Sequence, residues 1–113
     1  MKYLFILSTL FYLGTSFAQD AKTQTVSFKT SAVCGECKER IEKELNYTKG
    51  IIFAELDVDT KILTVKYKTK DLTEQKIKEI VSKLGYDAGD VPKDVEGFEK
   101  LPKCCKGEGN HKH

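Results

Sequence analysis

Three short stretches of the chain alternate apolar and polar residues. In Thr23–Lys29, Val26 and Phe28 fall on one face, and threonine, serine and lysine fall on the other. The same period of two recurs in Ile51–Val58 and Ile62–Tyr67, around a tight reversal at Asp59-Thr60-Lys61. Such alternation, rich in β-branched and aromatic residues, predicts a first strand and a later hairpin. The inward positions expected for the hairpin are Ile52, Ala54, Leu56, Val58, Leu63, Val65 and Tyr67.

Two longer stretches repeat their apolar residues at helical spacing. Cys37, Ile41 and Leu45 recur four residues apart, with charged residues between them. A second set follows Thr73, the expected N-cap of its helix, and stops before Gly85, a residue type common just after a helix end. The spacing predicts two amphipathic helices. The apolar members of the second are Ile77, Ile80, Val81 and Leu84.

A last short apolar stretch, Tyr86–Val91, ends at Pro92 and predicts a weak fourth strand. The order is then βαββαβ, which is typical of an α+β, ferredoxin-like sandwich: a four-stranded antiparallel sheet with both helices on one face. In that layout the loop between the first strand and the first helix is exposed at the edge of the domain. Residues 92–113 contain few apolar side chains, and we expect them to form a flexible or partly docked tail.

The length and the net charge of the chain limit the number of domains and the functions that can be expected. At 113 residues the chain has room for one small domain, and its net charge of +2 gives no electrostatic case for nucleic-acid binding. Residues 1–18 combine Lys2, an apolar run and the small residues Ser16 and Ala18, which predicts a cleaved export signal too short to span a bilayer. We therefore expect a monomeric domain over residues 19–91, exported to the periplasm or secreted, without a membrane span.

The four cysteines form two tight pairs, Cys34/Cys37 and Cys104/Cys105. In an exported chain an even number of cysteines usually indicates disulfides. A disulfide within either pair would close a very small loop, however, and would gain little from chain entropy. Closely spaced thiols are better explained as metal chelates or redox pairs.

The first pair lies where the loop meets the first predicted helix. Free backbone N–H groups and the positive end of the helix dipole favour thiolates there. Two thiolates suit a soft ion of low coordination number, Cu(I) or Hg(II), whereas Zn(II) prefers four ligands and is less expected. The same C-x-x-C spacing also serves thiol–disulfide oxidoreductases. The two prolines, Pro92 and Pro102, both follow the last predicted strand, which argues against a thioredoxin-like site.

These features together resemble the heavy-metal-associated domain family, which includes copper chaperones, modules of metal-pumping P-type ATPases and the periplasmic mercury-binding protein. The resemblance covers about Thr23–Val91. It implies a domain that binds one soft ion through Cys34 and Cys37, with Tyr86 near the metal loop. Family members often carry Met where this chain has Ala32. The motifs that carry the resemblance are Cys34-x-x-Cys37, Ile41, Leu45, Gly50, the reversal at Asp59, and Ile80 to Gly85-Tyr86.

The expected function is that of a metal carrier rather than an enzyme. It would hold Cu(I) or Hg(II) between two thiolates and transfer the ion by ligand exchange to a metal-transporting membrane protein or a P-type ATPase metal-binding module. A small oxidoreductase and a metal buffer without a fixed partner are the alternatives. Candidates for a second metal site, or for donors that reach back to the first loop, are Cys104, Cys105, His111 and His113. An oxidised cysteine pair and chance histidines are the simpler readings of that segment.

Overall fold

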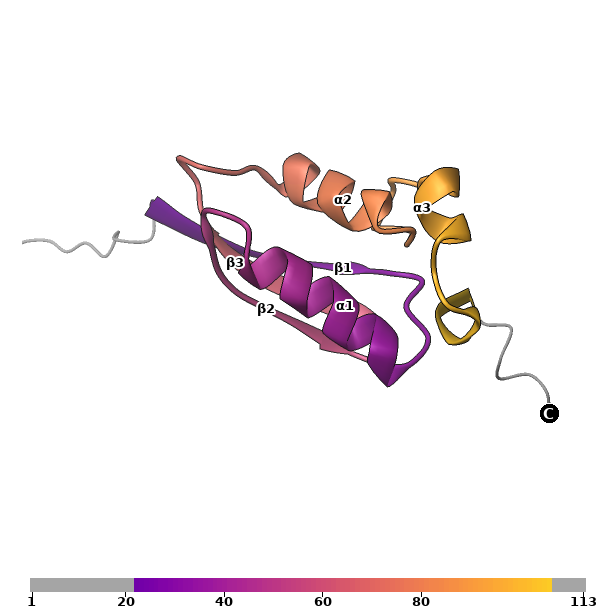
Figure 1. The fold of residues 1–113 in the computed structure, drawn as a ribbon. Helices are drawn as coiled ribbons and strands as arrows, with labels where there is room; N and C mark the ends of the chain where they lie inside the picture. Colours follow the sequence, from indigo (N-terminus) through magenta and orange to yellow (C-terminus); the bar gives the residue numbers. More distant parts are fainter. Residues whose placement is uncertain (1–21, 107–113) are drawn as a thin grey trace, which may run out of the picture.

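The computed structural model describes residues 22–106. Its strands and main helices match the elements expected from the sequence, apart from the fourth strand. Two further short helices follow the domain and lie at one end of the molecule (Figure 1). In chain order the elements are β1 (Thr23–Lys29), α1 (Gly35–Asn46), β2 (Ile51–Asp57), β3 (Ile62–Lys68), α2 (Glu74–Lys83), α3 (Val95–Glu99) and the 3-10 helix η2 (Lys103–Lys106).

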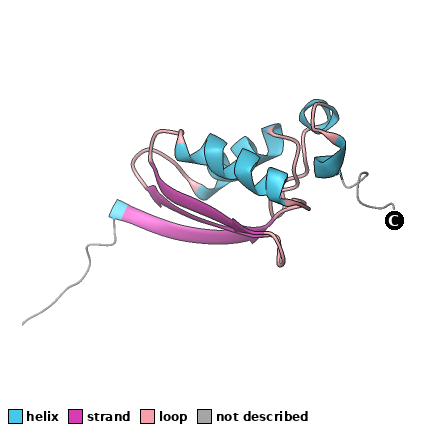
Figure 2. Ribbon diagram, turned by 60° about the horizontal axis from the view of Figure 1, so that its bottom comes forward, coloured by secondary structure: helices cyan, strands magenta, loops and turns pink. Residues whose placement is uncertain are grey.

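The three strands form one antiparallel sheet in the order β1-β3-β2. In the central strand, Val65 faces Val26 on one side and Ala54 on the other. α1 and α2 both cover one face of this sheet (Figure 2). The core lies between them because the apolar face of each amphipathic element points there. Its fully buried helical residues are Cys37, Ile41, Leu45, Ile77 and Val81.

The inward pattern expected for β2 is only partly correct. Ala54 and Leu56 are buried as predicted, but Ile52 is 43% exposed. The pairing with β3 shifts between Ile51 and Phe53, which is a β-bulge. A bulge adds one residue to its strand and therefore reverses the alternation on one side of it. Val58, the remaining expected position, lies just beyond the end of β2.

Both ends of α2 follow the predicted chemistry. The Thr73 hydroxyl accepts a hydrogen bond from the Lys76 N–H, at 3.1 Å, and so caps the helix. Gly85 follows the C-cap with φ of +109°, a conformation that favours glycine. The helix consequently stops where the chain must turn back toward the loop that carries the first cysteine pair.

The fourth strand is a correction to the sequence-based expectation. Within the described residues, Tyr86–Val91 makes isolated bridges and no strand: Ala88 pairs once with Thr30 and once with Val91. Ala88 and Val91 exchange two N–H···O bonds of 2.9 Å, so the chain reverses over Gly89-Asp90. Gly89 has φ of +59°, as such tight reversals require. The result is an α+β fold with a three-stranded sheet in place of the four-stranded ferredoxin-like sheet.

Residues 92–106, the described part of the expected tail, pack against the domain. Ser82 Oγ donates to the Pro92 carbonyl at 2.8 Å, and the Asp94 N–H donates to the Ser82 carbonyl at 3.0 Å. Leu101 and Cys105 are only 6% and 3% exposed. Residues 107–113 lie outside the described part of the chain, and the expected histidine donors His111 and His113 are among them.

α3 approaches α2 through a contact between two glycines. A Cβ atom on Gly85 would lie 2.8 Å from the carbonyl carbon of Gly97, and one on Gly97 would overlap the Lys83 carbonyl oxygen. Backbone therefore meets backbone at this point. Glycine at both positions allows the chain after Pro92 to lie directly on the end of α2.

Across residues 22–106, no helix is both long enough and apolar enough to cross a membrane. The expected export signal, residues 1–18, is outside the described residues.

Candidate metal centre

The first cysteine pair lies at the start of α1. Cys34 is the N-cap residue in an extended conformation, and its carbonyl accepts from the Cys37 N–H at 3.0 Å. Cys37 is in the first turn and fully buried, whereas Cys34 is half-buried. Their sulfur atoms are 3.4 Å apart. The buried sulfur of Cys37 and the more accessible sulfur of Cys34 therefore lie next to each other at the start of α1.

Hydrogen bonds between backbone groups and side chains hold the loop in front of this helix. The Val33 N–H points at the Cys37 sulfur, with an N···S distance of 3.4 Å. Thr30 Oγ1 accepts from the Ala32 N–H and donates to the Lys61 carbonyl. Ala32, two residues before Cys34, is fully buried.

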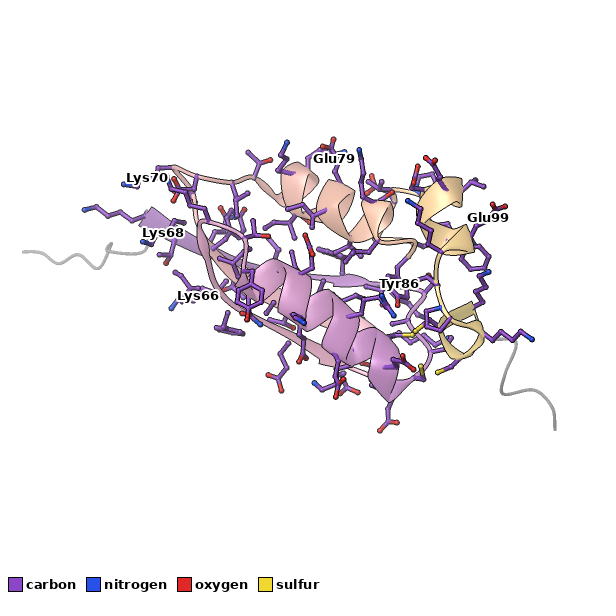
Figure 3. All side chains as sticks on the ribbon, viewed as in Figure 1. Lys66, Lys68, Lys70, Glu79, Tyr86 and Glu99 are labelled. Carbon is purple, nitrogen blue, oxygen red and sulfur yellow. The ribbon has the colours of Figure 1, made fainter. Side chains whose placement is uncertain are left out.

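The second cysteine pair reaches the first. η2 brings Cys105 Sγ to 4.0 Å from Cys34 Sγ, although the two residues are 71 positions apart in the sequence. The sulfur atoms of Cys34, Cys104 and Cys105 all lie within 4.8 Å of one another. Figure 3 shows the yellow sulfur atoms gathered at the end of the molecule where α1 begins and η2 lies. The structure therefore places the tail cysteines beside Cys34.

Tyr86 lies on the interior side of the cluster formed by the four cysteines (Figure 3). Its side chain is 1% exposed, and the buried hydroxyl has no hydrogen-bond partner of standard geometry among the described residues. The thiols of Cys37 and Cys105 are its polar neighbours. Burial and these two thiols raise the tyrosine pKa far above its usual range, so the hydroxyl remains a donor. The sequence-based expectation that Tyr86 lies near the metal loop agrees with this position.

The thiols differ in their acidity. Burial raises the pKa of Cys34, but hydrogen bonds from Cys104 and from the N–H groups of Cys37 and Glu36 outweigh it and lower the pKa overall. The neighbouring Cys34 sulfur raises the pKa of Cys104 to about 11. Burial raises that of Cys105 to about 12. Of Cys34, Cys104 and Cys105, the thiol of Cys34 therefore ionises first.

The spacing of the sulfurs suits shared coordination of one ion. Thiolates about 2.3 Å from a common ion lie roughly 4 Å apart in a trigonal site and somewhat closer in a tetrahedral one. The Cys34–Cys105 distance of 4.0 Å matches the trigonal value, and the Cys34–Cys37 distance of 3.4 Å is shorter than both values, so these two sulfurs would move slightly apart around an ion. Soft thiolate donors select Cu(I) and related thiophilic ions.

Two residues that position the tail cysteines were missed in the sequence. Leu101 is buried and directly precedes the segment that carries Cys104 and Cys105. Phe98, Leu101 and Cys105 follow a helical spacing of three and four residues, which was the available signal. Gly97 acts through the absence of a side chain, and its role depends on a contact between segments that no local pattern reveals.

A family model described as the heavy-metal-associated domain matches residues 27–87, more than half of the chain. The chain belongs to this family of metal-binding domains. The match includes Cys34, Cys37 and Tyr86, and it ends before Cys104 and Cys105.

Individual relatives agree with this assignment. A copper-exporting P-type ATPase of Bacillus subtilis is 40% identical over 53 residues, which is 47% of this chain but only 7% of the ATPase. The solution structure of the N-terminal domain of a potential copper-translocating P-type ATPase from the same species, in its Cu(I)-loaded state, has a TM-score of 0.56 and 34% identity, covering 59% of this chain and 85% of that domain. The metallochaperone CopZ shares the fold, with a TM-score of 0.55 and 23% identity, covering 57% of this chain and 98% of CopZ.

Proposed function

We propose that this protein is an exported carrier of Cu(I), which it binds through Cys34 and Cys37. The observation that carries the proposal is the 3.4 Å separation of these two sulfurs at the start of α1. The lowered pKa of Cys34 supplies a thiolate near neutral pH. The relative at 34% identity whose structure is described as Cu(I)-loaded favours copper. Hg(II), another soft ion, is the second choice.

Transfer follows from the accessibility of the pair. The Cys34 sulfur is half-exposed, while Cys37 is anchored in the core. An incoming thiolate can bond to the ion as the Cys34–metal bond breaks, and Cys37 keeps hold of the ion during the exchange. We propose a metal-binding module of a membrane transporter as the receiver, because relatives of this chain are P-type ATPases. The signal-like residues 1–18 support export.

The test is a titration of the reduced protein with Cu(I) against a chromophoric chelator. Wild type should show one tight site per chain, and Cys34→Ser/Cys37→Ser should lose it, with affinity lower by at least about a hundredfold because soft ions bind poorly to hydroxyl oxygens. Thr25→Ser, on the exposed face of β1, is the matched control. Equal affinity in the cysteine variant and wild type would overturn the proposal.

The lowered pKa of Cys34 also favours a second candidate, a thiol–disulfide oxidoreductase that uses the same pair. Such an enzyme would cycle between the dithiol and a Cys34–Cys37 disulfide. A reduction potential in the oxidant range, roughly −180 to −120 mV, together with turnover of a disulfide substrate would favour it over the carrier.

A further inference from the structure

We infer that Cys104 and Cys105 belong to the same metal centre as Cys34 and Cys37. In this arrangement the tail gives the bound ion a third sulfur ligand and occupies the side from which a receiving protein's thiols must approach. The inference rests on the proposed function, since it assigns ligands and regulation to the same site.

The first support is the geometry of the sulfur atoms. Cys34 is shared by two donor sets: it lies 3.4 Å from Cys37 and 4.0 Å from Cys105. Cys34, Cys104 and Cys105 fit within 4.8 Å. The separation of Cys34 and Cys105 equals that of two thiolates in a trigonal site, about 4 Å. Because the Cys34 and Cys105 sulfurs are 4.0 Å apart, one ion can lie about 2.3 Å from both of them.

The second support is that the tail is held in place by contacts of its own. Gly97 lies against the backbone of Lys83 and Gly85, and any larger residue would overlap it. Ser82 is hydrogen-bonded to Pro92 and Asp94, and Leu101 is buried. These contacts fix the start and the middle of residues 92–106. η2 consequently lies at the cysteine loop because of packing that does not involve the thiols.

The third support is the Tyr86 hydroxyl. It is buried, without a partner of standard geometry, beside one thiol from each pair, Cys37 and Cys105. A buried donor without an acceptor is destabilising. A metal-bound thiolate sulfur is a good acceptor, so loading the centre would supply the missing partner.

The chemistry of release then includes one additional exchange. A thiolate of the receiving protein forms a bond to the ion as the bond from Cys105 or Cys104 breaks, and the freed tail thiolate takes a proton from water. The ion keeps its charge, and no electrons are transferred. The tail therefore raises the affinity for the ion and slows its transfer to other thiols.

X-ray absorption of the Cu(I)-loaded full-length protein tests the number of ligands. Wild type should show three sulfurs at the ion, and Cys104→Ala/Cys105→Ala should show two. In chelator competition the variant should bind Cu(I) at least about tenfold more weakly, and it should release Cu(I) faster to a small dithiol acceptor.

A variant that retains all four thiols separates ligation from other effects of the cysteine substitutions. Gly97→Val should displace α3 from α2, and with it η2 from α1, and it should reproduce the two-sulfur site and the faster release. Glu96→Ala, an exposed position on the same helix, is the matched control and should behave as wild type. Thermal unfolding verifies that both variants are folded.

The two proposals fail in different ways. Two sulfurs in wild type, with affinity and release unchanged in Cys104→Ala/Cys105→Ala, would overturn the shared centre and leave the carrier proposal intact. Tight binding retained in Cys34→Ser/Cys37→Ser would overturn the carrier proposal itself.

Discussion

The two cysteine pairs are similarly exposed to solvent, but the structural elements that hold them in place differ. Each contributes one buried sulfur, from Cys37 or Cys105, and one half-exposed sulfur, from Cys34 or Cys104. The first pair is built into α1, whose inner face lies in the main core. The second is on a short 3-10 helix held by Leu101 and a glycine contact.

This difference bears on local stability. A segment fixed by few buried contacts opens at a lower free energy than a segment that shares the global core. The Cys34/Cys37 pair should therefore persist as long as the domain is folded, whereas Cys104/Cys105 can detach while the domain remains intact. The unequal supports would therefore make the first pair of thiols permanent and the second pair releasable.

The largest loss of stability is expected from a cavity in the part of the core that supports Cys34 and Cys37. Ile41→Ala removes a fully buried side chain from α1 and should lower the free energy of unfolding by about 2–5 kcal/mol. Urea unfolding followed by circular dichroism measures it. Glu39→Ala, exposed on the same helix, should change the midpoint little. A loss below about 1 kcal/mol would contradict the view that the core supports this pair.

A smaller loss of stability is expected when a buried side chain that supports Cys104 and Cys105 is truncated. Leu101→Ala should lower global stability by no more than about 1–2 kcal/mol, because the tail can detach and so limit the loss. Amide hydrogen exchange should accelerate in residues 92–106 and remain unchanged in α1. Val95→Ala, at a residue 67% exposed, is the control. Faster exchange spread over the whole domain would show that the two supports are not separate.

The smallest effect concerns the acidity of the thiols in the metal-free protein. Cys34 should react with iodoacetamide faster than Cys104 by about tenfold or more near pH 7, because only the thiolate reacts and the pKa of Cys34 is lowered while that of Cys104 is raised to about 11. As the pH rises toward 11, Cys104 ionises and the ratio should shrink. Peptide mapping of the alkylated protein measures both rates. Equal rates at pH 7 would contradict the electrostatic coupling between Cys34 and Cys104.

The regular elements were predictable because their signal is local. Alternation in Ile62–Tyr67 and helical spacing in Cys37, Ile41 and Leu45 identified β3 and α1 correctly. The same rule placed Ile52 inward, since a bulge depends on pairing between strands rather than on one strand's sequence. Tyr86–Val91 has strand-like residues, but its Gly89-Asp90 turn prevails.

The candidate site was predictable in part. The position of Cys34 and Cys37 at the start of a helix followed from spacing alone. The approach of Cys105 to Cys34 did not, because it depends on Gly97 lying against Gly85, a contact between two segments that each look like a loop in the sequence. Such backbone contacts produce no periodic pattern of apolar residues, so the sequence does not show which donors they bring together.

The early reversal at Gly89-Asp90 determines where the chain continues. β1 runs toward the cysteine loop, so a full fourth strand paired antiparallel to it would have started at the loop and run away from it. A partner for all seven residues of β1 would have carried the chain roughly 23 Å toward the opposite end of the sheet. Because pairing stops after Ala88, the next residues stay at the cysteine end, and η2 needs no long connection to reach Cys34. By keeping residues 92–106 at the cysteine end of the sheet, the early reversal gives Cys104 and Cys105 a high effective concentration near Cys34 and Cys37.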